Sequence, residues 1–157
     1  MSAFPITHLN FAGDARAALE FYASAFGGQA VVRTYGDFGM PAGLPDTDRV
    51  VFGQVVGAAS GFTVMAYDVP GVAEARGLAG AAGSTRRENG TTVTDQPFFL
   101  ALNAGSLEDA RLSWEALAAG ATVVEPLAAS AWSAGFGMLT DRFGVTWVLS
   151  VTDDERA

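Results

Sequence analysis

The chain has 157 residues, half of them hydrophobic and 17% charged, and a formal net charge of −8. This length and composition suit one domain, or two small modules that share a core, with enough apolar surface to bury. The negative charge excludes nucleic acid and anionic membranes as partners, because both need a basic face, and the absence of cysteine excludes disulfides, thiolate catalysis and Cys-bound metals.

The first predicted element is a strand over residues 5–12, whose side chains alternate in polarity. Leu9 and Phe11 fall on one face of this strand, and His8 and Asn10 fall on the other. We expect the apolar pair to pack against a helix. His8 and Asn10 then point towards more polar surroundings, which makes them candidates for a binding site.

A helix, a long loop and three strands complete the N-terminal half. Asp14 is the expected N-cap of the helix, and the apolar stripe of the helix stops at the glycine pair that follows Phe26. The loop over residues 36–48 is rich in glycine and proline, which is typical of a rim or lid. The predicted strands cover residues 29–35, 49–56 and 62–68.

The same order of elements begins again after a weakly patterned segment. Residues 69–96 form a connector, with one short helix predicted at 73–82. Ser106 then caps a second helix, with Asp109 three residues later in an acidic variant of the capping box. The predicted strands of this half cover residues 98–104, 122–127, 138–140 and 145–151, the last two joined by a turn at Asp141, and strand alternation places Trp147 on the helix side.

The two halves therefore read as two copies of one unit. FYASAFGGQAVV (residues 21–32) matches SWEALAAGATVV (residues 113–124) in a mid-helix aromatic, a closing glycine and a Val-Val strand start. A repeat of this size implies two modules that share a core. We expect a single domain over residues 1–157, with modules at about 5–68 and 97–152 joined by the connector at 69–96.

Both ends of the chain resemble a known family. LNFAGDARAALEFYASAFGG (residues 9–28) and AWSAGFGMLTDRFGVTWVLS (residues 131–150) are similar to the opening and closing segments of the PhnB-like branch of the vicinal oxygen chelate superfamily. That superfamily includes glyoxalase I, extradiol dioxygenases and bleomycin-resistance proteins. The resemblance implies an α+β fold in which two βαβββ modules form curved mixed sheets around a cavity, with the helices on the outside.

The residues needed for two activities known in the superfamily, methyl transfer and metal-dependent catalysis, are not recognisable in this sequence. The branch often carries the name of a demethylubiquinone methyltransferase, but the glycine-rich loop and following acidic residue that bind S-adenosylmethionine are not found here. The metalloenzymes use four inward-facing His, Gln or Glu side chains, and a divalent cation needs such oxygen or imidazole donors. The resemblance places those positions at Ile6 or Thr7, Val64–Met65, Phe99 and Val148. We therefore expect no metal and no other cofactor.

Five residues are the candidate ligand contacts, namely His8, Asn10, Gln54, Trp132 and Phe136. Gln54 stands where the PhnB-like pattern often has His, and Trp132 and Phe136 resemble the aromatic wall of that family. His8 is the one candidate for a catalytic base, although a lone histidine on a strand is more often structural. Gln54 could equally tie a strand edge, and Trp132 could equally belong to the core.

Two functions remain open at this point. The first is a metal-free protein that binds a small aromatic or cationic molecule in a cavity, as bleomycin-resistance proteins do by sequestration. The second is a metal-dependent lyase, isomerase or dioxygenase of the glyoxalase type, with His8 as general base. A structural role without a ligand is a third, plainer reading. We expect a cytoplasmic homodimer, because the family usually pairs and a shared bowl needs a partner to close it.

Overall fold

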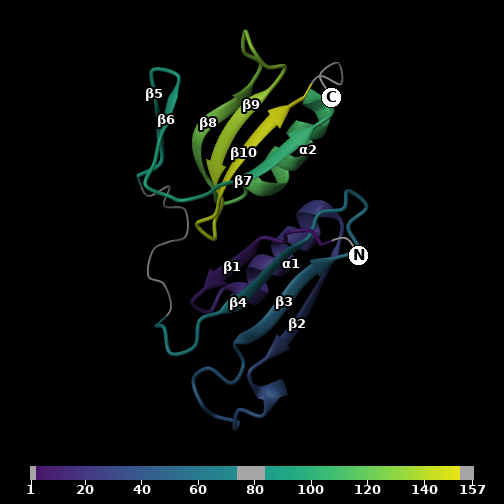
Figure 1. Cartoon of the computed structure of the whole chain (residues 1–157), viewed down its shortest axis with the longest axis vertical. Coiled ribbons are helices and arrows are strands. Elements are labelled where there is room, and N and C mark those ends of the chain that lie inside the picture. The colour runs from purple at the N-terminus through teal and green to yellow at the C-terminus, as the bar shows by residue number, and fades with distance from the viewer. Residues whose placement is uncertain (1–2, 74–83, 153–157) are drawn as a thin grey trace. The chain divides into compact units, whose positions relative to one another are not determined.

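The computed structural model describes residues 3–73 and 84–152 of the chain (Figure 1). The chain divides into two compact units, one ending at Ala75 and the other beginning at Arg76. Each unit contains a four-stranded mixed sheet with a single long helix, and each is described by itself.

The N-terminal unit is a βαβββ module. Its elements are, in order, β1 (His8–Phe11), α1 (Ala15–Phe26), β2 (Gln29–Thr34), the 3₁₀ turn η1 (Gly36–Phe38), β3 (Val50–Val56) and β4 (Val64–Asp68). The strand order is β1-β4-β3-β2, with β1 parallel to β4 and the other pairs antiparallel. β1 and β2 run in the same direction at opposite edges of the sheet, so the connection between them must cross one face of the sheet, and α1 makes that crossover.

The C-terminal unit repeats this plan after an additional hairpin. The hairpin is β5 (Arg86–Glu88) and β6 (Thr91–Val93), and the module itself is β7 (Leu100–Ala104), α2 (Leu107–Ala118), β8 (Thr122–Ala128), β9 (Phe136–Thr140) and β10 (Thr146–Val151). The order β7-β10-β9-β8, with β7 parallel to β10, is the order of the first sheet. The expected α+β fold of two βαβββ modules is therefore confirmed.

The core of the N-terminal module lies between α1 and one face of its sheet. Leu9 is buried on β1, as its alternation predicted, while His8 and Asn10 are exposed on the opposite face. Tyr22 and Leu19 of α1 are fully buried. A Cβ at Gly53 of β3 would lie 2.3 Å from the Leu19 Cδ1 atom, so the glycine allows the helix to approach the sheet closely.

The core of the C-terminal module is built in the same way. Trp147 and Leu149 of β10 are 1% exposed, and Leu139 of β9 and Leu117 of α2 are fully buried. The expectation that Trp147 faces the helix side is therefore confirmed. At Gly137 of β9 an added Cβ would lie 2.8 Å from the Trp114 ring of α2 and 2.9 Å from the Leu127 backbone, so a glycine is required where the helix crosses.

Both helix starts are held by oxygen acceptors, but not both as expected. Ser106 caps α2 by accepting a hydrogen bond from the Asp109 backbone N–H at 3.1 Å, which confirms Ser106 as the N-cap, and its hydroxyl also contacts the Asp109 carboxylate at 2.7 Å. Asp14 occupies the N-cap position of α1, yet its side chain makes no capping bond. The carboxylate of Asp68, distant in sequence, accepts from the N–H groups of Gly13 at 2.8 Å and Ala15 at 3.0 Å instead.

The strands begin and end within a few residues of their expected bounds, with one addition. The first strand begins at His8 rather than at residue 5, and the hairpin of β5 and β6 lies in the segment expected to be an unpaired connector. The short helix expected at 73–82 falls almost wholly on residues 74–83, outside the described part.

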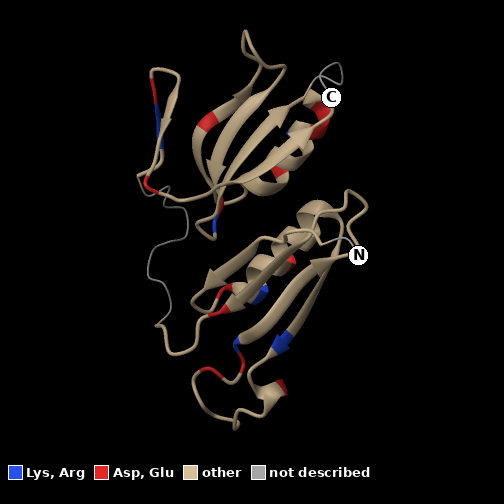
Figure 2. Ribbon diagram, in the orientation of Figure 1, with Lys and Arg blue, Asp and Glu red and all other residues tan. Residues whose placement is uncertain are grey.

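Arginines are scattered over both modules among acidic residues (Figure 2), so neither sheet carries a continuous basic stripe in the described ranges. Neither of the two long helices described is long and apolar enough to cross a membrane.

Candidate functional site

The face of the N-terminal sheet opposite α1 carries the predicted polar residues. The register pairs His8 with Met65, Met65 with Gln54, and Gln54 with Val31, so these four side chains form one row across the four strands. Asn10 and Tyr67 form the start of the next row on the same face. The sheet therefore brings His8 and Asn10 to one surface, as the alternation predicted, and Gln54 lies on the same surface.

His8 is held by its neighbours on this surface. Its Nδ1 atom lies 3.2 Å from the Asn10 side-chain oxygen, and its ring meets the Tyr67 ring edge-on with 5.3 Å between centroids. In the tautomer that carries its proton on Nδ1, the ring donates to this amide oxygen and Nε2 is an acceptor. The arrangement orients an exposed imidazole, and Nε2 is the atom that could accept a proton from a bound molecule.

Gln54 takes part in a local network. Its Nε2 donates to the Thr63 hydroxyl at 3.1 Å, and that hydroxyl donates to the Val55 carbonyl at 2.9 Å. These bonds fix the amide against the β3–β4 turn. The structure thus shows Gln54 tied to the segment before β4, which was one of its two interpretations, on the sheet face that His8 shares.

The face of the C-terminal sheet opposite α2 carries the predicted aromatic residues. Phe136 and Ser150 are register partners on β9 and β10, and Ser150 donates to the Asn103 side-chain oxygen on β7 at 2.7 Å. Trp132 lies in the segment before β9, with its ring 5.2 Å from the Phe136 ring at an interplanar angle of 59°. Trp132 is 69% exposed, which is unusual for so large an apolar side chain.

The hairpin of β5 and β6 brings a cation to this aromatic pair. The Arg87 guanidinium carbon lies 5.1 Å from the Phe136 ring centroid, within cation–π distance. Its Nη1 donates to Thr92 at 2.9 Å, and its Nε lies 3.8 Å from a carboxylate oxygen of Glu125 on β8. The Thr92 hydroxyl in turn lies 3.5 Å from the Met138 sulfur, so the hairpin packs on this sheet face.

Arg87 and Glu125 were not among the predicted site residues. Three-residue strands with charged members carry no recognisable hydrophobic alternation, so the hairpin left no signal in the sequence pattern. The predicted pair Trp132 and Phe136 is brought together by the structure, and the predicted trio His8, Asn10 and Gln54 shares a face of the other module. The two groups belong to different units of the chain.

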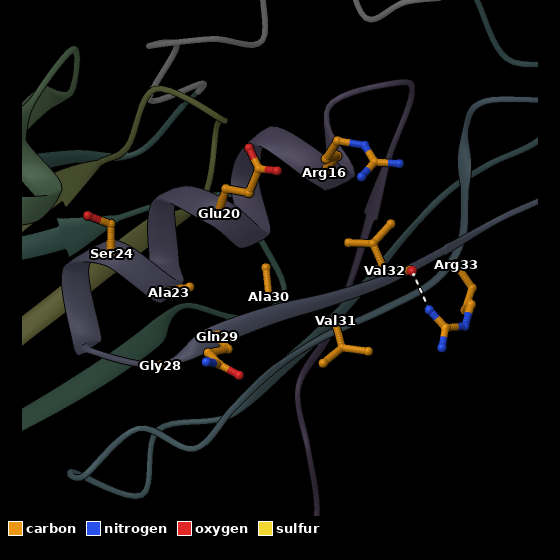
Figure 3. A pocket seen from close by; sticks show the side chains of 10 residues that line it. All are labelled: Arg16, Glu20, Ala23, Ser24, Gly28, Gln29, Ala30, Val31, Val32 and Arg33. Atoms are coloured by element: carbon orange, nitrogen blue, oxygen red, sulfur yellow. Dashed lines mark hydrogen bonds between the residues drawn. The ribbon is translucent and has the colours of Figure 1, made fainter.

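A separate hollow of about 730 Å³ lies between α1 and β2 in the N-terminal module (Figure 3). Arg16, Glu20 and Ser24 of α1 and Arg33 of β2 stand around it, and the Arg33 side chain donates to the Val32 carbonyl at 3.2 Å. None of the five predicted contact residues lines this hollow, and no aromatic side chain does. It lacks the apolar, stacking surface that small-molecule sites usually provide, so the open sheet faces are the better candidates.

The donor atoms of the open faces do not fit a divalent cation. The N-terminal face offers the His8 imidazole, which contacts the Asn10 side-chain oxygen, and the Gln54 amide, which is bonded to Thr63, rather than the set of imidazoles and carboxylates that such a cation prefers. On the C-terminal face, the Glu125 carboxylate lies beside Arg87. Within residues 3–73 and 84–152, no three His, Asp or Glu side chains gather closely enough to hold a metal ion.

The chain thus consists of two βαβββ modules. Each module has its helix on one face of the sheet and polar or aromatic side chains on the open face. The family model of the Glyoxalase/Bleomycin resistance protein/Dioxygenase superfamily matches residues 6–149 of the chain. The chain therefore belongs to that superfamily, which is the vicinal oxygen chelate superfamily that the two end motifs resemble. No curated protein matches the chain.

Solved structures of related proteins agree with this assignment. Protein PA1353 from Pseudomonas aeruginosa is 28% identical, with a TM-score of 0.70, and the match covers 98% of this chain and all of that one. A PhnB protein from Bacillus cereus is 22% identical, with a TM-score of 0.66, over 96% of this chain and 100% of that one. A glyoxalase/bleomycin resistance protein/dioxygenase domain from Frankia is 16% identical, with a TM-score of 0.59, over 99% and 96% of the two chains. The similarity to PhnB shows that the two chains share this fold.

Proposed function

We propose that the protein binds a small, planar aromatic or cationic molecule without a metal ion, in the manner of bleomycin-resistance proteins. The ligand contacts proposed are Trp132 and Phe136 on the C-terminal module, and His8, Asn10 and Gln54 on the N-terminal module. The observation that carries the proposal is the exposed Trp132 ring resting against Phe136.

An exposed tryptophan held by a second ring is suited to stacking. A tryptophan side chain buries a large apolar area when a ligand covers it. Aromatic pairs in offset or edge-to-face contact are stabilised by about 0.5–1.5 kcal/mol beyond that burial. Here the Phe136 ring orients the indole in advance, so less side-chain freedom is lost when a planar molecule binds. On the N-terminal module, considered by itself, His8 and Asn10 form a polar pair that can donate to or accept from a ligand.

Binding without a metal is supported by the chemistry of the donors. The positions to which the resemblance assigns the metalloenzymes' ligands hold Ile6 or Thr7, Val64–Met65, Phe99 and Val148, and none of these is a usual metal ligand. The polar donors of the open faces contact one another or an arginine. A site that binds a small molecule needs a complementary shape, apolar contacts and a few polar groups. The open faces carry such apolar and polar side chains.

A thermal-shift screen with aromatic and cationic metabolites tests the proposal. We expect at least one class to raise the melting temperature, and the Trp132→Ala variant to lose that shift. Leu112→Ala is the matched control, because Leu112 is 63% exposed but lies on α2, on the other side of the sheet. A ligand whose effect survives Trp132→Ala would place the binding surface elsewhere.

Metal analysis separates binding from glyoxalase-type catalysis. We expect protein purified without chelators to contain no stoichiometric Ni, Zn, Mn or Fe. One equivalent of such a metal, lost on His8→Ala, would contradict the proposal and favour the metal-dependent lyase, isomerase or dioxygenase.

We further propose that the protein is a cytoplasmic homodimer, which the family's usual pairing supports. Light scattering at several concentrations would test the dimer.

A further inference from the structure

The aromatic pair of the C-terminal module already contacts a cation that belongs to the chain itself. Arg87 lies over the Phe136 ring at 5.1 Å, which is where a ligand cation would be attracted by the ring's negative face. Glu125, the carboxylate that could add to that attraction, lies 3.8 Å from the Arg87 Nε atom. The ring face and the carboxylate that a cation would use are therefore both engaged by Arg87.

The positive charge of Arg87 is only partly neutralised. A separation of 3.8 Å is an ion-pair distance but too long for a hydrogen bond. The Arg87 Nε atom is buried, and within the described residues it has no hydrogen-bond acceptor. Arg87 has 16% of its side chain exposed and Glu125 has 40%, so the Arg87 charge lies largely shielded from water beside Phe136 while the Glu125 side chain is more open to solvent.

We infer that Arg87 sets the charge preference of the Trp132–Phe136 surface, favouring planar aromatic ligands with a carboxylate or other anionic group over aromatic cations. The inference rests on the proposed function, because it assigns a ligand class to the same aromatic surface. Trp132 supplies the exposed ring for stacking, and the guanidinium beside Phe136 supplies the charge that an anionic substituent would meet.

The overall acidity of the protein acts in the opposite direction but from further away. A net charge of −8 attracts cations through the long-range field. At physiological ionic strength such interactions are screened over about 8 Å. The Arg87 guanidinium lies over Phe136, whose ring contacts the Trp132 ring on which the ligand would stack, and at such short range it is screened much less, so the local charge determines the preference.

Three probes that share a naphthyl ring test the inference, namely 2-naphthoate, 2-naphthamide and (2-naphthylmethyl)trimethylammonium. Their dissociation constants are measured by tryptophan fluorescence in 0.15 M salt. For the unmodified protein we expect the anion to bind about tenfold more tightly than the cation. In Arg87→Met the order reverses, because the ring face of Phe136 and the Glu125 carboxylate become available to the cation.

A matched control separates the local effect from a change in net charge. Arg86→Met alters the same hairpin and the same net charge, but Arg86 has 53% of its side chain exposed and pairs with Glu88. We expect Arg86→Met to leave the order of the three probes unchanged. Glu125→Gln keeps Arg87 on Phe136 while removing its counter-charge, and it should strengthen the preference for 2-naphthoate by about threefold.

The outcomes distinguish this inference from the proposed function. Equal affinities for the three probes, or an equal shift in Arg86→Met and Arg87→Met, would overturn the charge preference and leave aromatic binding in place. If Arg87→Met does not fold, an unchanged preference in Glu125→Gln overturns it as well. Failure of every probe to bind the unmodified protein would contradict the proposed aromatic surface itself.

Discussion

The Asp141 carboxylate accepts a hydrogen bond from the indole Nε1 of Trp147 at 2.8 Å, in the interior of the C-terminal module. Its other oxygen accepts from the backbone N–H groups of Phe143 at 2.9 Å and Val145 at 3.1 Å. One carboxylate thus joins the β9–β10 turn to the largest side chain of the core. These three donors compensate the buried carboxylate for its lost hydration. If the carboxylate is removed, the three donors stay buried without an acceptor, which destabilises the folded state strongly.

Replacing Asp141 with Asn should destabilise the C-terminal module. The side chain keeps its size but loses the negative charge, and its NH₂ group then faces a donor. We expect the free energy of unfolding to fall by about 3 kcal/mol, measured by urea denaturation. All three tryptophans lie in this half of the sequence, so their fluorescence reports on it.

Asp109→Asn serves as the control for that prediction. Asp109 is an exposed member of the α2 capping box, where the same substitution should cost about 1 kcal/mol or less. Equal losses for the two variants would show that the bonds made by Asp141 add little beyond those of a surface carboxylate.

Asp68 has a comparable place in the N-terminal module. Its carboxylate accepts from Gly13 and Ala15 at the start of α1 and from Val50 at the start of β3, with the last bond at 2.9 Å. We expect Asp68→Asn to lower the urea midpoint by an amount worth about 2–4 kcal/mol. All three tyrosines lie in this half, so tyrosine near-UV circular dichroism measures the effect. A midpoint unchanged from the unmodified protein would contradict the assigned role.

The repeated module could be predicted from sequence because each element has a local signal. Strand alternation placed Leu9 inside and His8 outside, and the same rule placed Trp147 in the core. Ser106 and Asp109 are close in sequence, so their capping contact could be read from spacing alone. These features depend on neighbours within a few residues.

The features that were missed depend on partners far along the chain. Asp68 replaces Asp14 as the acceptor for the α1 start because the end of β4 lies against it, and only the strand order reveals that proximity. Arg87 reaches Phe136 and Glu125 in the same manner, across 49 and 38 residues of sequence (136 − 87 and 125 − 87). Single-sequence patterns hold no information on such pairs.

Any larger residue at position 137, where α2 crosses the sheet, should lower the stability of the C-terminal module. An alanine Cβ there would meet the Trp114 ring at 2.8 Å and the Leu127 backbone at 2.9 Å, and the backbone cannot move aside cheaply. We expect Gly137→Ala to reduce the free energy of unfolding by about 1–3 kcal/mol through overpacking. Thermal or urea denaturation followed by tryptophan fluorescence measures this loss.

Gly105→Ala is the control for this crossing. A Cβ at Gly105 meets no atom within 4 Å, and its backbone is not left-handed. It should leave stability unchanged or slightly higher, because alanine reduces the freedom of the unfolded chain. Equal losses of unfolding free energy in Gly137→Ala and Gly105→Ala would show that the close contact between α2 and the sheet is not the reason for a glycine at position 137.

Asp37 should give the loop after β2 a dependence on acid pH. The Thr34 backbone N–H donates to its carboxylate at 2.8 Å, and this bond, followed by one with the Thr34 side chain, lowers the pKa of Asp37 below its ordinary value, with Arg33 and Arg16 adding smaller effects. A depressed pKa means that the ionised form stabilises the folded loop. That contribution is complete above the unfolded-state pKa and is lost as pH falls through the folded-state pKa.

A carbon-detected NMR titration of the Asp37 carboxyl group measures this pKa directly, and we expect a midpoint below that of an aspartate in an unfolded peptide. Thr34→Ala should move the midpoint only part of the way back, because the larger cause, the backbone bond, remains. Asp37→Asn should remove the acid-dependent change in the amide signals of η1 (Gly36–Phe38) while leaving those of β9 unaffected. An Asp37 midpoint at or above the unfolded value would mean that the Thr34 bond does not persist in solution.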